Sequence, residues 1–384
     1  MRFYRLQPDR PAELSYFYSM QIGDIIRFLE TLAPPSLQES YDNAGLLTGS
    51  AAWKCTDILV SLDATEEVIL EAKQKGCNLV VAHHPIVFGG LKKITGKNYV
   101  ERAVIASIKN DVALYAIHTN LDNVITGVNA KMAERLGLVN CKILQPKSGL
   151  LKKLFCFVPV SHAEFVRAAI FDAGGGHIGN YSECSFSAAG KGTFKAADGS
   201  NPFVGEIGKR HEEEELKIEV IFPAWQEHSI LSAMIKAHPY EEVAYDVVSL
   251  DNRLQTTGSG LIGELPKPLI PNDFLQLLKD QFNLTVIKHT IPPAKSIHRV
   301  ALCGGAGSFL TKTALASGAD AYVTGDVKYH EFFDAENRLL LADIGHWESE
   351  QFTIDLLADH LQDKFPTFAV LKTAVKTNPV EYFK

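Results

Sequence analysis

Hydrophobic positions in the first third of the chain switch between helical spacing and short apolar runs. The segment IGDIIRFLETLAP places Ile25, Ile26 and Leu29 on one face, which predicts an amphipathic helix that ends at Pro34. Three apolar runs of strand length follow, each ahead of a helical pattern: TDILVSLDAT, NLVVAHHP and VALYAIHTNLD. Strands that are apolar on both faces and alternate with helices predict a largely parallel sheet that helices cover on both sides.

The pattern changes near Leu150. Six segments follow in the order strand, helix, strand, strand, helix and strand: KKLFCFVPV, AEFVRAAIFDAG, YSECSFSAAGKGTFK, EELKIEVIFPA, SILSAMIKAHP and AYDVVSL. This βαββαβ order is typical of the ferredoxin-like arrangement. Polar joints flank it near Lys147 and from Asp251 to Gly260. We therefore predict an inserted domain over residues 149–252.

The alternation of strands and helices resumes after the insert, in HRVALCGGAGSFLTKTALASGA, AYVTGDV and LLLADIGH. The fold class predicted is therefore α/β, with a core that is split into residues 20–148 and 253–384 and forms one doubly wound body. Residues 1–19 contain arginines and prolines without the apolar stretch of a signal peptide, so we interpret them as an N-terminal extension.

Composition excludes several classes of protein. The 384 residues suffice for two or three domains, and the hydrophobic share of 46% is that of a globular chain. The net charge of −7 disfavours nonspecific binding of nucleic acid, because lysine and arginine are not in excess. No apolar stretch reaches the roughly 20 residues of a membrane helix, and the six cysteines form no C-x-x-C pair. We expect a reducing, cytoplasmic environment and no membrane contact.

Side chains that bind metals follow nearly every predicted core strand. Ligands of parallel α/β sheets bind beyond the carboxyl ends of the strands, so these positions are the first candidates for a site. They are Asp63, His83, His84, His118, Asp122, Asp326, His330 and His346, with Glu350 just inside the next helix.

Each of these residues also has a plain structural interpretation. The His83-His84 pair can cap a strand or form buried hydrogen bonds, and Asp122 lies in a segment with the composition of a turn. Glu350 can be a capping carboxylate, although four residues of helix would bring it to the same side as His346. Together, three imidazoles and two carboxylates would cost several kcal/mol or more to bury without a cation.

The types of ligand limit the choice of ion. Imidazole and carboxylate without thiolate suit Zn, Mn, Fe or Co rather than Ca or Mg. Five ligands exceed the needs of one catalytic ion, so we expect two divalent ions about 3.5–4 Å apart, which would activate a water for hydrolysis.

A glycine-rich turn is a second candidate feature. Gly304, Gly305 and Gly307 follow the strand in ALCGGAGSF and precede a predicted helix near Ser308. Such a turn can bind an anion through its backbone amides, for example the phosphate of a substrate, or it can be a plain strand-to-helix connection.

Several motifs together resemble the Nif-three-like family, also called GTP cyclohydrolase 1 type 2 homologues. They are SYDNAGLLTG, LVVAHHPIVF, HTNLD with GVN, CGGAGS, TGDVKYH and GHWESE, and the resemblance spans about residues 20–384. The segments IGNYSECSFS and AHPYEEVAYDVVSL of the insert resemble the CutA/PII-like domain of longer family members. The resemblance implies two divalent metals on the same five residues, namely His83, His84, Asp122, His346 and Glu350, and a homohexamer.

The resemblance also implies an activity, the metal-dependent opening of the imidazole ring of GTP with loss of formate. Two alternatives stay open: a metal-dependent phosphoesterase, and a metal-binding scaffold or sensor whose CutA/PII-like domain controls assembly or access. Asp326 and His330 are candidates to relay protons, or they stabilise the TGD turn. His118 either orients a metal ligand or is a plain histidine at a strand end.

Overall fold

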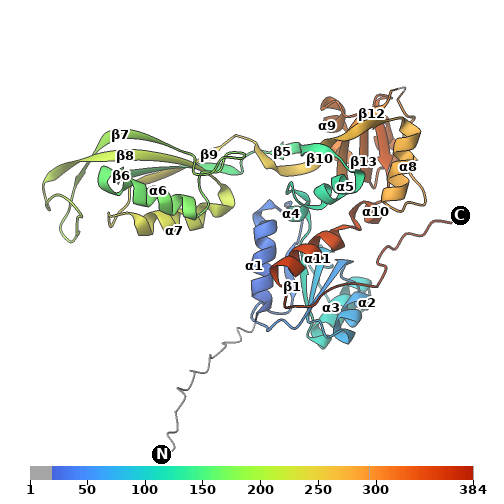
Figure 1. The fold of residues 1–384 in the computed structure, drawn as a ribbon. Helices are drawn as coiled ribbons and strands as arrows, with labels where there is room; N and C mark the ends of the chain where they lie inside the picture. Colours follow the sequence, from blue (N-terminus) through green and yellow to red (C-terminus); the bar gives the residue numbers. More distant parts are fainter. Residues whose placement is uncertain (1–19, 294, 384) are drawn as a thin grey trace, which may run out of the picture.

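The computed structural model describes residues 20–293 and 295–383, so the predicted N-terminal extension, residues 1–19, lies outside the described residues. The described chain folds into three sheets, of five, six and four strands. Figure 1 shows the two larger sheets side by side in the core and the four-stranded sheet on an arm that extends from it.

The five-stranded sheet has the order β1-β4-β3-β2-β15, and only β1 is antiparallel to its neighbour. Its side chains alternate between two faces, as expected for strands buried on both sides. The helices α1 and α11 cover one face and α2 and α3 cover the other. The bounds are α1 (Ile22–Leu32), β1 (Gly45–Thr48), β2 (Ile58–Asp63), α2 (Glu66–Gln74), β3 (Leu79–His84), α3 (Tyr99–Asn110), β4 (Ala113–Ala116), α11 (Thr353–Lys364) and β15 (Val370–Lys372).

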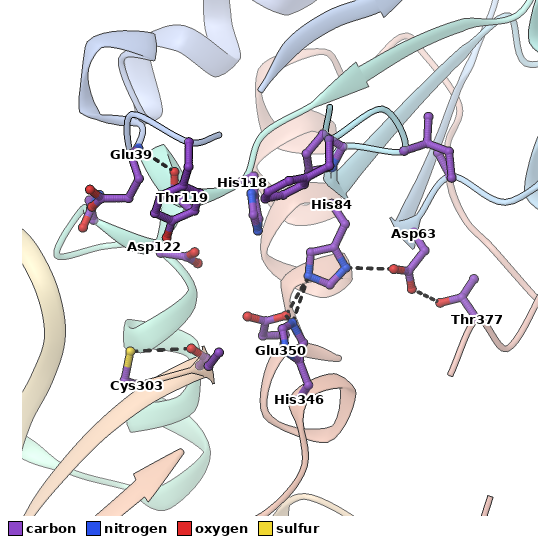
Figure 2. Close-up of a pocket in the computed structure, with 18 of the residues that line it drawn as sticks. Glu39, Asp63, His84, His118, Thr119, Asp122, Cys303, His346, Glu350 and Thr377 are labelled. Carbon is purple, nitrogen blue, oxygen red and sulfur yellow. Dashed lines mark hydrogen bonds and ion pairs between the residues drawn. The ribbon is translucent and has the colours of Figure 1, made fainter. Parts of the chain in front are cut away.

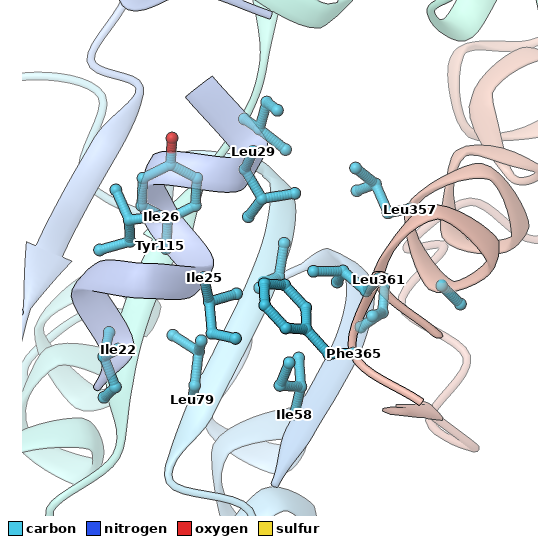
Figure 3. Close-up of a cluster of buried hydrophobic side chains, with 14 of the residues drawn as sticks. Ile22, Ile25, Ile26, Leu29, Ile58, Leu79, Tyr115, Leu357, Leu361 and Phe365 are labelled. Atoms are coloured by element: carbon cyan, nitrogen blue, oxygen red, sulfur yellow. The ribbon is translucent and has the colours of Figure 1, made fainter. Parts of the chain in front are cut away.

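The first helix shows how distant segments share this core. Ile25 and Leu29 are fully buried on the inner face of α1, as the spacing of the sequence predicts. They belong to one hydrophobic cluster with Ile58 of β2 and with Leu361 of α11, more than 300 residues further along the chain (Figure 3). The two ends of the described chain are therefore held against the same sheet.

The six-stranded sheet has the order β11-β14-β13-β12-β10-β5, in which only β12, β13 and β14 are parallel. The helices α5 and α8 cover one face, while α9 and the 3-10 helix η5 cover the other. The bounds are α5 (Val128–Leu136), β5 (Val139–Lys147), β10 (Leu254–Leu269), α8 (Pro271–Gln281), β11 (Lys288–His289), β12 (Ile297–Ala306), α9 (Thr311–Ala316), β13 (Ala321–Gly325), η5 (Tyr329–Ala335) and β14 (Leu340–Asp343).

The predicted α/β core of covered sheets, split in sequence by an inserted domain, is confirmed. The core has two sheets, and each half of the chain supplies a strand to the other half's sheet, namely β5 and β15. The predicted polar joint from Asp251 to Gly260 also begins the long strand β10. Gly258 permits this pairing, because a Cβ atom there would lie 2.1 Å from the carbonyl oxygen of Gln145 on β5.

The inserted domain has the predicted βαββαβ order, with its strands arranged as β7-β8-β6-β9. Both helices pack on one face, over a core that includes Cys156, Ile218 and Phe222. The domain leaves the core after β5, which ends at Lys147, and returns at β10, which begins at Leu254. Its elements are β6 (Leu151–Pro159), α6 (Ala163–Asp172), β7 (Ser185–Lys195), β8 (Arg210–Pro223), α7 (Glu227–Ala237) and β9 (Tyr245–Leu250).

No helix among residues 20–293 and 295–383 combines the length and the apolar character needed to cross a membrane.

Candidate metal centre

Four of the five predicted ligands line one cavity of about 960 Å³ between both halves of the core, and the fifth, His83, is buried beside Asp122. Strand β3 ends in His83 and His84, and the short helix α4 (Thr119–Asp122) contributes Asp122. The short helix α10 (His346–Glu350) contributes the other two ligands from the opposite sheet. Figure 2 shows Asp122, His84, His346 and Glu350 around the same space.

Glu350 is the centre of this cluster. Its carboxylate is only 3% exposed, and its Oε2 lies 2.9 Å from His84 Nε2 and 3.2 Å from His346 Nε2. Its other oxygen, Oε1, lies 3.9 Å from His83 Nε2, which is 3.5 Å from Asp122 Oδ1. The carboxylate of Glu350 therefore has one pair of candidate ligands beside each of its oxygens.

Each histidine of the cluster is oriented through its other ring nitrogen. His83 donates from Nδ1 to the carbonyl oxygen of Ile117 at 2.8 Å. His84 donates from Nδ1 to Asp63 at 2.8 Å, and His346 donates from Nδ1 to Asp326 at 2.7 Å. Such bonds select the tautomer in which Nε2 carries the lone pair, which is the arrangement of histidines that bind metals.

The charges of the cluster need compensation by protons or by cations. Burial disfavours charged His84, but its bonds to Asp63 and Glu350 prevail and raise its pKa to about 10. Burial also disfavours charged His346, but its bond to Glu350 prevails and raises the pKa of His346 to about 9. Burial and the charge of Glu350 raise the pKa of Asp122, whereas the three histidines outweigh burial and lower that of Glu350.

The five residues fit divalent metal ions on two further observations. The buried atoms His83 Nε2 and Asp122 Oδ1 have no hydrogen-bond partner, and a buried polar atom left in this state costs about 1–3 kcal/mol. Two groups with ligand atoms within 4.8 Å of one another share Glu350, one with His84 and His346 and one with His83 and Asp122. A cation in the second of these groups would use both unpartnered atoms.

Cys303 also lines the cavity, which the sequence did not indicate. Burial, together with the charges of Asp122 and Glu350, raises the pKa of its thiol far above the ordinary range. Cys303 belongs to none of the groups whose ligand atoms lie within 4.8 Å of one another, so the donor set of these groups is nitrogen and oxygen.

The glycine-rich turn has a different role from the predicted anion site. The amides of Gly304, Gly305 and Gly307 donate to side chains of the protein itself, those of Asn129, Ser349 and Thr324. Gly305 has a φ of +63°, and a Cβ atom there would lie 2.4 Å from Glu350 Oε1. These glycines therefore allow strand β12 to approach Glu350 closely, and their amides are already used.

The two residues predicted to relay protons, Asp326 and His330, lie in different surroundings. Asp326 lies beside the cavity, where it orients His346. His330 lies in η5, where its ring packs against Tyr329 and Phe333, and it is not among the residues that line the cavity. The predicted proton relay through His330 is therefore not supported by a place in the lining of the cavity.

His118 does face the cavity, and sequence reasoning missed the residue behind it, Asp42. His118 donates from Nδ1 to Asp42 at 2.8 Å, across 76 residues of sequence. The backbone amide of Thr119 donates to the other oxygen of Asp42. Although burial opposes ionisation, these bonds lower the pKa of Asp42 to about 2. Asp42 stands in the motif SYDNAGLLTG, which was the only signal in the sequence.

The fold and the site together define an α/β protein with histidine and carboxylate groups that could hold metal ions. The chain belongs to the Duf34/NIF3 (NGG1p interacting factor 3) family, which matches residues 20–379. It is 40% identical over 363 residues to the GTP cyclohydrolase 1 type 2 homolog of Halalkalibacterium halodurans, covering 93% of this chain and 98% of that one. It is 38% identical to the homolog of the same name from Bacillus subtilis, over 84% of this chain and 87% of that one.

Solved structures agree with this assignment. A Bacillus cereus protein related to NIF3 has a TM-score of 0.84 and 38% sequence identity, and the match covers 94% of this chain and 99% of that chain. A Staphylococcus aureus protein has a TM-score of 0.76 with 28% identity, over 95% of this chain and 99% of that chain.

Proposed function

We propose that this protein is a hydrolase that uses two divalent metal ions, Zn, Mn, Fe or Co, and acts on a nucleotide. The observation that carries the proposal is Glu350, whose two buried oxygens each face a separate pair of candidate ligands. The names of its relatives, GTP cyclohydrolase 1 type 2 homolog, support opening of the imidazole ring of GTP as the reaction.

The ligand residues would divide between two ions. His83 and Asp122 would hold one, His84 and His346 would hold the other, and Glu350 would contact both. When bound, such ions supply Lewis acidity and lower the pKa of a water molecule toward about 7. Ile117, Asp63 and Asp326 keep the three imidazoles in the orientation that binding requires.

His118 is the residue of this chain best placed to move a proton in the reaction. One of its ring nitrogens lies within 4.8 Å of nitrogens of His83 and His84, and its Nδ1 is held by Asp42. A histidine backed by a carboxylate can accept a proton from an attacking water and return it to the leaving group. We assign this role to His118 in place of His330.

A product assay tests the activity. Purified protein loaded with Mn, Zn, Fe or Co is incubated with GTP, and formate and inorganic phosphate are measured separately. Formate release that His346→Ala abolishes supports ring opening, while release of phosphate alone supports a phosphoesterase.

His118→Ala should lower the rate by about 100-fold or more with the metals retained, and His330→Ala should match the parent protein. If neither the parent protein nor any of these variants releases formate or phosphate, the proposed hydrolase activity is rejected.

A metal-binding scaffold is the second candidate, and the inserted domain favours it. This domain has its own cavity of about 710 Å³, lined by Phe157, Phe194 and Tyr240, on an arm away from the metal centre (Figure 1). We propose that the domain contributes to assembly of the expected homohexamer. Light scattering of the full chain and of a variant without residues 149–252 tests this role. An unchanged oligomeric mass would reject it.

A further inference from the structure

We propose that the metal cavity recognises the planar heteroaromatic ring of its nucleotide or nucleoside ligand through a rim of four aromatic side chains, and that a polyphosphate chain adds no affinity. This inference rests on the proposed function, because it names the substrate class of the same site. The aromatic rim consists of Tyr41, Phe88, Tyr99 and Phe309, which all line the cavity that holds the candidate metal ligands.

The first observation is the exposure of these rings. Tyr41 is 64% exposed, Phe88 51%, Tyr99 65% and Phe309 65%, and all four stand around one opening. Single exposed aromatic residues are ordinary on protein surfaces, whereas several around one concave site mark a place where a ligand is bound.

The second observation is the relation of the rim to the histidines. The rings of Tyr41 and Phe88 are nearly parallel, with an interplanar angle of 28° and centroids 6.3 Å apart. Phe88 also packs edge-to-face on His118, at 5.9 Å. Flat apolar surface therefore continues from the opening to the candidate proton carrier, so a ring stacked on the rim would lie beside the reacting groups.

The third observation is the charge of the cavity wall. Four carboxyl groups line it, and no lysine or arginine of residues 20–293 or 295–383 does. The nearby Lys147 is already paired with one of these carboxylates, Glu39, at 2.5 Å. The four carboxyl groups belong to Glu39, Asp63, Asp122 and Glu350.

This charge pattern argues against recognition of the polyphosphate chain of a triphosphate. Proteins that bind nucleoside triphosphates place lysine, arginine or free backbone amides around the phosphates. Here the amides of Gly304, Gly305 and Gly307 donate to Asn129, Ser349 and Thr324. Two divalent ions would bring four positive charges, which the four carboxylates of the cavity wall equal, so no lining charge is left to pair with a polyphosphate chain.

Equilibrium binding to the metal-loaded full-length protein tests the proposal. Guanosine, adenosine and GTP are titrated by calorimetry in buffer that contains Mg²⁺, and metal content is measured after each titration. We expect a nucleoside to bind at least as tightly as GTP. Tyr41→Ala and Phe88→Ala should each weaken nucleoside binding by about 5- to 150-fold, the range for loss of one base–aromatic stack.

Matched variants separate stacking from general damage. Phe165→Ala removes an aromatic ring of similar exposure on α6 of the insert and should leave binding unchanged. Tyr41→Phe keeps the ring and should retain the parent affinity. Metal content should stay at the parent level in all four variants, because none of these side chains is a candidate ligand.

Three results would overturn the proposal: no binding of either nucleoside, binding that Tyr41→Ala and Phe88→Ala leave unchanged, or GTP binding more than tenfold tighter than guanosine. The outcome is independent of turnover. Nucleoside binding that depends on the rim, in a protein that releases neither formate nor phosphate, would support the rim and reject the hydrolase.

Discussion

The metal centre and the cavity of the inserted domain each contain a buried carboxylate oxygen, but the two sites differ in whether that oxygen has a hydrogen-bond partner. In the insert, Glu215 accepts a hydrogen bond from the hydroxyl of Tyr240 at 3.0 Å, and three lysines line the same cavity beside its apolar side chains. In the core, Asp122 keeps an oxygen without any partner, beside the equally unpartnered His83 Nε2. Burial of an acid alone therefore does not indicate a cation. Potential ligand atoms that converge without a hydrogen-bond partner do indicate a cation.

The two regions also differ in how the chain builds them. All elements of the insert lie within residues 151–250, so its core depends on contacts between neighbouring segments. The metal centre joins His84 to Glu350 across 266 residues. The comparison predicts that the metal centre is sensitive to single changes in the core and insensitive to the insert.

The largest effect is expected from Glu350→Gln. The amide keeps the size of the side chain but removes the negative charge between both pairs of ligands, so both ions should be lost, with affinity lower by more than about 100-fold. Metal content after dialysis measures the loss. Glu348→Gln on the same helix is the control, since Glu348 binds Asn378 outside the metal cavity. Retention of two ions by Glu350→Gln would contradict the shared carboxylate.

A smaller and one-sided effect is expected from Asp63→Asn. Asp63 accepts the Nδ1 proton of His84 and contacts no other candidate ligand by a hydrogen bond among those described. Loss of such an orienting carboxylate costs about 10- to 100-fold in metal affinity. Titration against a competing chelator should show one ion weakened and one unchanged. Asp111→Asn at an exposed helix end is the control, and equal weakening of both ions would reject the assignment.

Metal affinity should fall as the pH falls. In the metal-free protein the pKa values of His84 and His346 are about 10 and about 9, so both rings are protonated at neutral pH. A metal must displace these protons, and each proton released changes the affinity about tenfold per pH unit. Affinity should therefore rise from pH 6 to about pH 10, less steeply above pH 9, and then level off. Calorimetry in buffers of different ionisation enthalpy counts the protons, and a count of zero would contradict the prediction.

The smallest effect is expected when the insert is removed. Lys147 of β5 and Leu254 of β10 are register partners, so an Asn-Gly turn can join them in place of residues 148–253. The shortened protein should bind metal within about twofold of the parent affinity, because no candidate ligand lies in the insert. A thermal melt checks that the core is folded. Loss of metal from a folded core would show that the two regions are coupled.

Local patterns predicted much of the fold because they need only neighbouring residues. The periodicity of Ile25, Ile26 and Leu29 placed α1, and the apolar run ahead of His83 and His84 placed β3. The edge strand β1 and the long pairing of β5 with β10 were missed, since both depend on partners distant in sequence. The polar stretch that begins β10 has no strand pattern of its own, and Gly258 becomes informative only once β5 lies against it.

The sequence by itself determined the chemistry of the candidate centre. Histidines and carboxylates at strand ends, with His346 and Glu350 one helical turn apart, are local features, and the structure brings all five predicted ligands together. Only the tertiary structure decided that Asp42 stands behind His118, that His330 lies away from the cavity, and that the glycines make room for Glu350. The physical reason is that these relations arise where two sheets from distant parts of the chain meet, and no local pattern encodes that meeting.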